Sequence, residues 1–213
     1  MLTIALVDLG MGNLHSVERA LARAGADAGL ACTVDRTSDP EAILRADKIV
    51  VPGQGAFRDC AAALTSGIGD ALRAAIAAGK PYFGICLGLQ ALFAESEEAP
   101  GAAGLGVFAG NVARLAPSAG VKIPHMGWNR VTLVGSPSGA LRTITAEDAH
   151  FYFVHSFHAV PDAPELVAAV TDHGPHRVTA AVQRDNVTAT QFHPEKSQGA
   201  GLRLLAAFLS QAG

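Results

Sequence analysis

The chain has 213 residues, of which 49% are apolar and 16% are charged, and its formal net charge is −3 at pH 7. This length fits one large α/β domain and the apolar fraction is enough for a sizeable core, so we expect a single domain over residues 1–213. The sequence has no block of Lys or Arg residues. That argues against binding to nucleic acid, or to an anionic membrane surface, through a broad basic face.

The cysteine usage indicates a reducing compartment. Cys32, Cys60 and Cys86 are odd in number, and no two of them have the CxxC spacing of a metal or redox site. The N-terminal segment lacks the basic start of a signal peptide, and the charge-free run of residues 81–94 is too short to span a membrane. We therefore expect a cytoplasmic protein with free thiols and no membrane segment.

In the first half of the chain, short apolar runs alternate with segments of helical spacing. Continuous apolar runs suit parallel strands, because helices cover both faces of such a sheet. The predicted strands are Leu2–Val7, Ala31–Val34, Lys48–Val51 and Pro81–Ile85. The predicted helices run from Leu14 to Gly25, from Pro40 onward, and over Ala56–Leu64, Gly69–Ala78 and Leu87–Ala94. This order predicts an α/β fold with an open, mostly parallel sheet and helices on both faces.

The second half is divided by Gly, Pro and Asp into shorter apolar segments, which predict a C-terminal antiparallel extension. These segments are Gly106–Leu115, Asn129–Leu133, His150–Ser156, Val167–Thr171, Val178–Gln183 and Val187–Gln191. The Ala-, Gly- and acid-rich stretch Glu95–Gly106 is predicted to be a surface loop. A last amphipathic helix is expected from about Gln198 to Leu209.

The segment Gly84–Gly88 (GICLG) follows a predicted strand and precedes a predicted helix. This is the context of a nucleophile elbow, with Cys86 in the usual place of a serine. Its sulfur would lie at the carboxyl end of a parallel strand, where such sheets bind ligands, and at a helix N-terminus, which favours a thiolate. Taken alone, the pattern fits an inert buried cysteine in a glycine-rich turn equally well.

A second motif, Gln191–Glu195 (QFHPE), supplies a candidate base. Pro194 favours an extended conformation at His193, so the side chains of His193 and Glu195 would lie on the same side of the chain. Glu195 would then orient the imidazole, as in a base held by a carboxylate. The alternative is a surface turn. The elbow cysteine, about a hundred residues earlier, favours the catalytic interpretation because each motif supplies what the other lacks.

A glycine-rich turn, Val51–Phe57 (VPGQGAF), follows another predicted strand. Its backbone N–H groups, together with that of Leu87, would form an oxyanion hole. The alternatives are a simple turn into a helix and a phosphate cradle, although the Lys-Ser/Thr ending of a P-loop is absent.

The remaining histidines and the sole tryptophan carry weaker signals. Two histidine pairs have HxxH spacing: His155 with His158, and His173 with His176. Neither has the HExxH context of a zinc protease, so we predict structural or surface roles, no metal site and no cofactor. Trp128 fits either the core or an interface anchor.

Together these motifs resemble the class I, triad-type glutamine amidotransferases. GICLG, PGQGAF and HPEKS carry this resemblance, in which the elbow and HPE identify only the class and PEKS is more specific. Three further segments, DLGMGNL (8–14), HMGWN (125–129) and YFVHSF (152–157), are similar more specifically to the glutaminase subunits of imidazole glycerol phosphate synthases of histidine biosynthesis. The resemblance extends from Asp8 to Ser197. Leu9, where an aromatic residue is common, departs from the pattern but has no proposed catalytic role.

The resemblance implies roles for particular residues. Cys86 would be the nucleophile, His193 the base and Glu195 its orienting partner. The backbone groups that would stabilise the oxyanion are those of Gly53, Gln54, Gly55 and Leu87. The residues that would bind glutamine are Gln90, Ser156 and Phe157. Those that would lie at or near a subunit interface are Asn13, Met126, Trp128, Tyr152 and Lys196.

The resemblance also implies a heterodimer with a separate (β/α)8 cyclase subunit. This chain would hydrolyse glutamine to glutamate and ammonia. The ammonia would pass through the partner's barrel, where imidazole glycerol phosphate and an aminoimidazole carboxamide ribotide are made. Glutaminase activity would stay low until the partner binds its own ligand.

Three other functions are open at the level of sequence. A glutaminase of anthranilate or guanylate synthesis is disfavoured by HMGWN and PEKS. A stand-alone γ-glutamyl hydrolase would be active on glutamyl peptides without a partner. A non-enzymatic module on a degenerate amidotransferase fold is disfavoured by the intact set of Cys86, His193 and Glu195.

Overall fold

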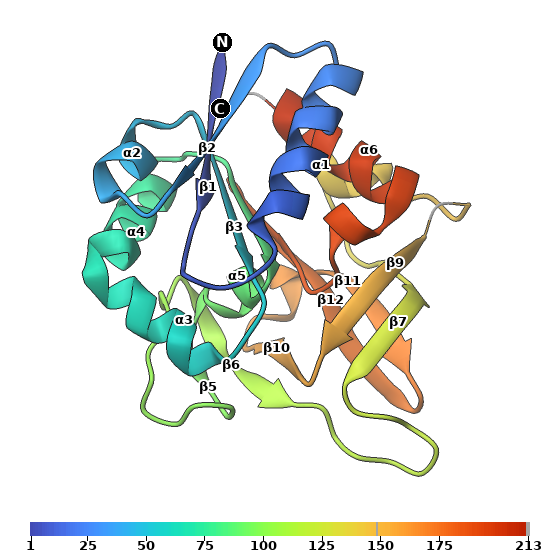
Figure 1. Cartoon of the computed structure of the whole chain (residues 1–213). Coiled ribbons are helices and arrows are strands. Elements are labelled where there is room, and N and C mark those ends of the chain that lie inside the picture. The colour runs from blue at the N-terminus through green and yellow to red at the C-terminus, as the bar shows by residue number, and fades with distance from the viewer. Residues whose placement is uncertain (148, 212–213) are drawn as a thin grey trace.

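The computed structural model describes residues 1–147 and 149–211. Within them the largest sheet has eight strands, in the order β2-β1-β3-β4-β13-β12-β11-β8 (Figure 1). The strands are β1 Leu2–Val7, β2 Cys32–Thr37, β3 Lys48–Gly53, β4 Tyr82–Cys86, β8 Thr132–Leu133, β11 Val167–His173, β12 His176–Arg184 and β13 Val187–Thr190. The five from β2 to β13 pair in parallel, and the three beyond β13 continue the sheet antiparallel.

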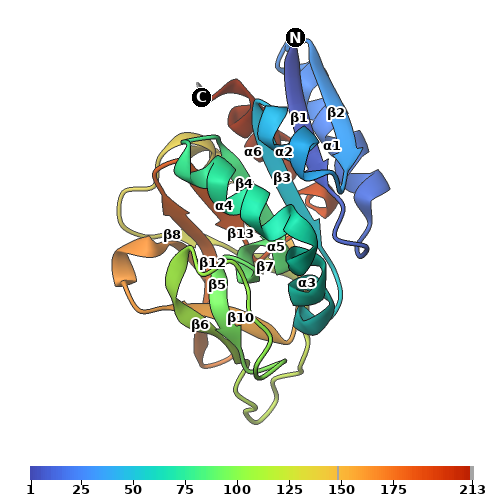
Figure 2. The ribbon, with the colours of Figure 1, turned by 90° about the vertical axis from the view of Figure 1, so that its left-hand side faces the viewer.

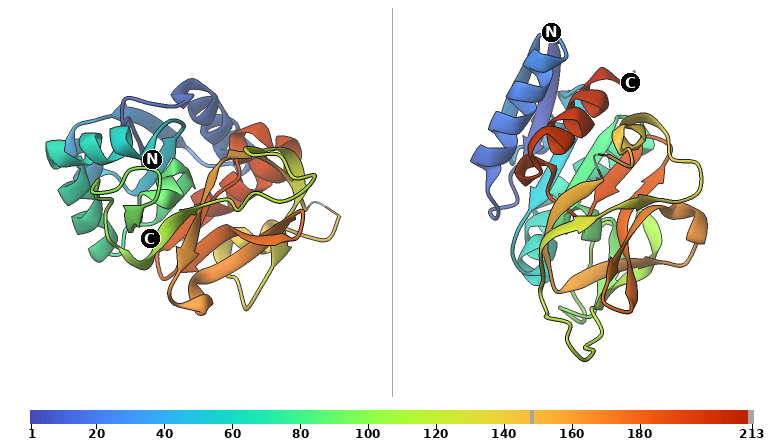
Figure 3. Two further views of the ribbon diagram at one scale, coloured as in Figure 1. Left: turned by 90° about the horizontal axis from the view of Figure 1, so that it is seen from below. Right: turned by 90° about the vertical axis from the view of Figure 1, so that its right-hand side faces the viewer.

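Helices cover both faces of the parallel part, as the sequence predicts. Figure 3 shows α1 (Leu14–Asp27) and α6 (Gln198–Ser210) side by side over one face. Figure 2 shows the other face, covered by α2 (Pro40–Arg45), α3 (Phe57–Ala63) and α4 (Gly69–Ala77). Val50 belongs to the core beneath α1 and α6, whereas its neighbours Ile49 and Val51 belong to the core beneath α2–α4. Successive side chains of β3 point to opposite faces of the sheet, so this strand contributes to both cores.

Two smaller sheets flank the carboxyl ends of the parallel strands. One has the order β10-β6-β5, from Phe157–Pro161, Phe108–Arg114 and Phe93–Ser96. The other pairs β7 (His125–Arg130) with β9 (His150–His155). A bridge between Tyr152 and His193 ties this two-stranded sheet to the chain that leaves β13. Among the described helices, none is long and apolar enough to cross a membrane.

Several predicted boundaries are wrong in the middle of the chain. The predicted helix Leu87–Ala94 is only one turn, α5 (Leu87–Gln90), and the chain then enters β5. Periodicity alone does not separate a buried strand from a buried helix in a short apolar run. Here the backbone of Ala91 and Ala94 accepts hydrogen bonds from Leu105 and Gly104, which replace the helical ladder.

The stretch Glu95–Gly106 is likewise only partly a surface loop. It begins inside β5, and Ser96, Ala99 and Leu105 are buried. Strand β7 begins at His125, ahead of the predicted Asn129, and β10 was not predicted.

Two other predicted features differ in detail. Val187–Gln191 was assigned to the antiparallel extension, but β13 pairs in parallel with β4 and antiparallel with β12, so the sheet changes direction there. All four residues of β13 are buried, as expected of a central strand. Helix α1 continues past Gly25 to Asp27, and a side chain at Gly25 would collide with the sulfur of Cys32.

Candidate active site

The Cys86 turn has the geometry of a nucleophile elbow. Cys86 joins β4 to α5 with φ 55° and ψ −101°, a strained conformation for a non-glycine residue. Its two flanking glycines are required by packing. A Cβ on Gly84 would lie 2.6 Å from the carbonyl oxygen of Gly88, and one on Gly88 would overlap the carbonyl oxygen of Val51. The missing side chain of Gly88 therefore lets the turn pack against β3, and that of Gly84 lets the turn close on itself.

The candidate base lies where β13 leaves the sheet. His193 precedes the short 3-10 turn Pro194–Lys196, and its backbone N–H donates to the Tyr152 carbonyl at 2.9 Å. The Ser197 hydroxyl donates to the His193 carbonyl at 2.6 Å, so the backbone is held on both sides. His193 Nδ1 bonds to Glu195 Oε1 at 2.8 Å, and both side chains are at most 2% exposed. The carboxylate thus orients the imidazole. His193 is extended as predicted, but Glu195 lies in the 3-10 turn and not on the extended segment that the Pro194 spacing predicted.

The electrostatics of His193 favour a charged imidazole. Burial alone would lower the pKa of His193, but its interactions with Cys86 and Glu195 outweigh burial and raise that pKa to about 9. The other ring nitrogen, Nε2, is buried and makes no hydrogen bond within the described residues. With Nδ1 held by Glu195, Nε2 is the nitrogen available for proton transfer.

A cavity of about 440 Å³ lies in front of Cys86. It is at the carboxyl ends of β3 and β4, where open α/β sheets bind ligands. Its lining contains most of the residues predicted from the sequence: Gln54, Gly55, Cys86, Leu87, Gln90, Tyr152, Ser156, Phe157 and Lys196. It also contains Glu98, Pro124, Val154 and His155, which were not predicted to be site residues.

The predicted oxyanion segment lies beside the elbow. A Cβ on Gly53 would lie 2.7 Å from the Cβ of Leu87, so the two backbones approach closely. The loop that precedes α1 packs on the same segment, since a Cβ on Gly12 would lie 3.2 Å from the Gln54 nitrogen. Gly55 has φ 141°, a conformation that disfavours any side chain.

Glu98 is a cavity residue that the sequence reasoning missed. It comes from the stretch predicted to be a surface loop, and its Oε2 accepts the Phe57 N–H at 2.9 Å. This bond fixes a carboxylate in the wall of the cavity. No local pattern marks Glu98, because the turn that brings it there depends on β5 and β6 pairing.

His155 also lines the cavity and belongs to a chain of buried histidines. Its Nδ1 donates to the Phe157 carbonyl at 2.9 Å, and its Nε2 accepts from His125 Nδ1 at 3.0 Å. Burial, followed by the proximity of other histidines, lowers the pKa of His155 to about 3 and that of His125 to about 4. These lowered pKa values favour the neutral form of both rings. The sequence predicted a structural or surface role for His155 and missed its place in the cavity wall.

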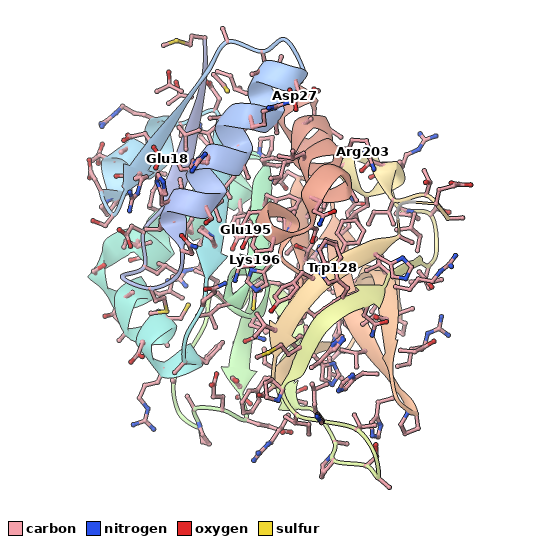
Figure 4. All side chains as sticks on the ribbon, turned by 45° about the vertical axis from the view of Figure 1, so that its right-hand side comes forward. Glu18, Asp27, Trp128, Glu195, Lys196 and Arg203 are labelled. Carbon is pink, nitrogen blue, oxygen red and sulfur yellow. The ribbon has the colours of Figure 1, made fainter. Side chains whose placement is uncertain are left out.

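The residues predicted at a subunit interface divide into two groups. Tyr152 and Lys196 line the cavity, with the Lys196 ammonium 5.8 Å from the centre of the Tyr152 ring. Trp128 stands outside it on β7, 48% exposed, with its ring 6.3 Å from that of Tyr152. Figure 4 shows Lys196 beside Glu195 near the centre of the molecule and Trp128 out on the β7 ribbon. Met126 is 62% exposed on the same strand.

Asn13 lies apart from these residues. Its side chain accepts the Ser16 N–H and caps α1. The residue is exposed next to Gly12, which packs on the Gln54 backbone. It is therefore placed at the edge of the predicted oxyanion segment.

Known proteins resemble this chain over almost its whole length. The model of the family "Glutamine amidotransferase class-I" matches residues 6–212. The chain is 51% identical to imidazole glycerol phosphate synthase subunit HisH of Methylococcus capsulatus, over 98% of this chain and 96% of that protein. It is 46% identical to the subunit of the same name from Acinetobacter baylyi, over 98% of each.

A solved structure agrees at the level of the fold. The glutaminase domain of Trypanosoma brucei CTPS, with bound acivicin, superposes with a TM-score of 0.68 at 19% identity, covering 100% of this chain and 96% of that one. The chain therefore belongs to the class I glutamine amidotransferase family and, within it, to the family of imidazole glycerol phosphate synthase HisH subunits.

Proposed function

We propose that this chain is the glutaminase subunit of an imidazole glycerol phosphate synthase, with Cys86, His193 and Glu195 as its catalytic triad. The observation that carries the triad is the buried His193–Glu195 pair. The Nε2 of His193 makes no hydrogen bond within the described residues, and Cys86 and Glu195 raise the pKa of this histidine. Cys86 lines the cavity, whereas His193 and Glu195 are buried behind it. A thiol at the cavity wall, a base that interacts with it and a carboxylate that orients the base are the requirements of covalent amide hydrolysis.

In the first half-reaction, the Cys86 sulfur attacks the side-chain amide carbon of glutamine. A carbon–sulfur bond forms and the carbonyl oxygen becomes an oxyanion, next to the N–H groups of Leu87 and of the Gly53–Gly55 segment. His193 gives its Nε2 proton to the departing nitrogen, so the carbon–nitrogen bond breaks and ammonia leaves. A glutamyl thioester remains on Cys86.

In the second half-reaction, His193 takes a proton from water, which attacks the thioester carbon. The carbon–sulfur bond breaks, glutamate leaves, and Cys86 and His193 return to their starting state. Covalent catalysis thereby divides one difficult amide cleavage into two easier steps. Glu195 stays hydrogen-bonded to Nδ1 and stabilises the imidazolium each time it forms.

The cavity wall supplies candidate contacts for the amino-acid end of glutamine. Glu98 presents a carboxylate suited to an α-ammonium group, and the Ser156–Phe157 backbone offers further polar groups. Gln90 is held at the base of the cavity by a bond of 3.0 Å from its Nε2 to the Phe157 carbonyl.

The partner in this proposal is a (β/α)8 cyclase subunit that receives the ammonia. Free ammonia is useful only if it reacts before it is protonated, so a partner that closes the cavity is a physical requirement. The exposed apolar side chains of Met126 and Trp128 suit such a cover, since these residues pair with the cavity residues Val154 and Tyr152 on β9.

Replacing the nucleophile tests the proposal. In complex with the cyclase subunit, Cys86→Ala should lose glutamine-dependent product formation but keep synthesis from added ammonium salts. Cys32→Ser, which changes a partly buried thiol on β2, should keep both activities. Glutamine-dependent turnover by Cys86→Ala at the parental rate would remove Cys86 from the mechanism.

A further inference from the structure

Gln191 is a buried amide that the triad does not use. It follows β13, has no exposed surface, and its backbone N–H donates to the Ala180 carbonyl at 2.8 Å. Its side-chain Nε2 donates to the Cys86 sulfur at 3.4 Å. The amide therefore contacts the reacting atom of the proposed nucleophile.

Gln191 reaches the sulfur where the chain bends as it leaves β13. The bend covers Gln191 and Phe192, and His193, which follows, is extended. Phe192 enters the core, with its ring centre 4.3 Å from that of Phe151, while Gln191 and His193 both turn toward Cys86. One short segment thus places two polar side chains against one thiol.

The direction of the Gln191 amide is set by a second glutamine. Gln90 Nε2 donates to the Phe157 carbonyl at 3.0 Å and to Gln191 Oε1 at 3.2 Å. Because Oε1 already accepts from Gln90, the donor end of Gln191 points at the sulfur. An N–H group stabilises a thiolate, whereas a carbonyl oxygen at the same place would oppose it.

We propose that Gln191 is a fourth polar residue of the nucleophile site, which donates to the Cys86 thiolate and links it to Gln90 in the wall of the glutamine cavity. The proposal rests on the assignment of Cys86 as the nucleophile. The alternative is a purely structural role, in which the Gln191 amide forms buried hydrogen bonds that stabilise the fold and does not affect the thiol. The two roles differ in one measurable respect, because a structural role changes stability without changing the reactivity of the thiol.

Alkylation of Cys86 by iodoacetamide separates the two roles, since the reagent reacts with the thiolate and needs no glutamine. In Gln191→Met, which keeps the volume but loses the donor, the rate of Cys86 labelling at neutral pH should fall on the order of tenfold. Its rise with pH should also shift to higher pH. Mass spectrometry of the labelled peptide distinguishes Cys86 from Cys32 and Cys60.

Gln191→Glu provides a second, sharper variant. Its carboxylate still accepts from Gln90 Nε2 but places negative charge at the sulfur, so the labelling rate should fall further than in Gln191→Met. The matched control is Gln183→Met on β12, whose amide bonds to Ser138 and Thr188. That variant should label at the parental rate.

Thermal unfolding of each variant identifies those that fold, and the labelling of either folded Gln191 variant decides the proposal. Parental rates and pH dependence in a folded Gln191→Met or Gln191→Glu would overturn it. The result is independent of the glutaminase assignment, because labelling measures the thiol and the Cys86→Ala experiment measures glutamine turnover.

Discussion

At the scale of single residues, the central fact is that a basic side chain is buried yet held in its charged form. Removal from water disfavours an imidazolium, so His193 depends on the negative groups beside it. Glu195 is 2% exposed and bonds to Nδ1, while Cys86 interacts electrostatically with the ring. The charge on His193 is thus a property of three side chains together.

Glu195→Gln should expose this dependence. The amide keeps a hydrogen bond to Nδ1 but loses the charge, so the pKa of His193 should fall from about 9. In the proposed mechanism His193 must be protonated to release ammonia, so the alkaline limb of the pH–rate profile should move to lower pH. The kcat for glutamate release should fall on the order of 10²-fold.

Glu18→Gln is the matched control for this measurement. Glu18 is partly exposed on α1, with a long contact of 3.7 Å to Arg36, and Figure 4 shows it away from Glu195. Its pH–rate profile should be parental. An unshifted alkaline limb in Glu195→Gln would mean that the carboxylate does not support the charge of His193.

The sequence predicted those site residues whose proposed roles depend on neighbours within a few positions of the chain. Cys86 lies between glycines that a sharp turn requires, and His193 and Glu195 lie two apart around a proline. Glu98 and His155 were missed as site residues because their places depend on strand pairing between distant segments. No pattern within a short window contains that information.

At the scale of elements, the elbow depends on the contact between α5 and β3. Gly88→Ala should lower the free energy of unfolding by about 1–3 kcal/mol, because the added methyl group overlaps the Val51 carbonyl oxygen. Relief of this overlap moves α5 and Cys86, so glutaminase activity should fall as well. Urea unfolding and glutamate release measure the two effects.

Gly199→Ala on α6 is the control for the elbow. There the added methyl group meets only the end of the Arg203 side chain, at 3.2 Å, which can move. Stability should change little, since alanine is also the better helix former. If both variants unfolded alike, the overlap with Val51 would not be the cause.

Pairing of β7 with β9 buries two neutral histidines, and this predicts an acid-sensitive fold. In the unfolded chain their pKa is near 6.5, whereas in the fold it is about 4 for His125 and about 3 for His155. As pH falls from 6.5 toward 4, these two histidines therefore become protonated in the unfolded chain but not in the folded protein. Each residue should lower the free energy of unfolding by up to about 1.4 kcal/mol per pH unit.

Replacing both histidines by glutamine should flatten this acid dependence, even if stability near neutral pH is reduced. Urea unfolding at a series of pH values gives the slope for each protein. His15→Gln, at an exposed position on α1, serves as control and should keep the parental slope. Equal slopes in the double variant and the parent would contradict the assignment of two neutral rings.

Helices and strands could be predicted where the apolar residues followed one clear pattern, either helical spacing or a continuous strand run. The parallel strands and the amphipathic α6 followed the apolar pattern, whereas the run Leu87–Ala94 suited a buried helix or strand equally. Hydrogen bonds from Leu105 and Gly104 decide that case. These partners lie outside the run, so the boundary between α5 and β5 could not be read from it.

At the scale of the whole molecule, two of the exposed apolar side chains lie on β7, whose partner strand β9 lines the cavity. Met126 and Trp128 are 62% and 48% exposed on β7, and Trp128 contacts Tyr152, whose ring faces Lys196. From the sequence, Trp128 could belong either to the core or to an interface. Its exposure in the structure excludes the core. Resemblance placed it at an interface, which stays a prediction.

Trp128→Ala tests that interface. A half-exposed tryptophan contributes little to the isolated fold, but once buried against a partner it is a frequent binding hot spot. The Kd for the cyclase subunit, measured by titration calorimetry, should rise at least about 10-fold, while the unfolding midpoint of the isolated chain should stay close to the parental value.

Leu44→Ala provides the comparison on the opposite side of the molecule. Leu44 is 37% exposed on α2, which lies away from β7 in Figure 1. Its loss should leave the Kd unchanged, because nothing places α2 near the cavity. Parental affinity of Trp128→Ala for the cyclase subunit would show that β7 is not part of the interface. The partner would then have to dock elsewhere around the cavity to receive the ammonia.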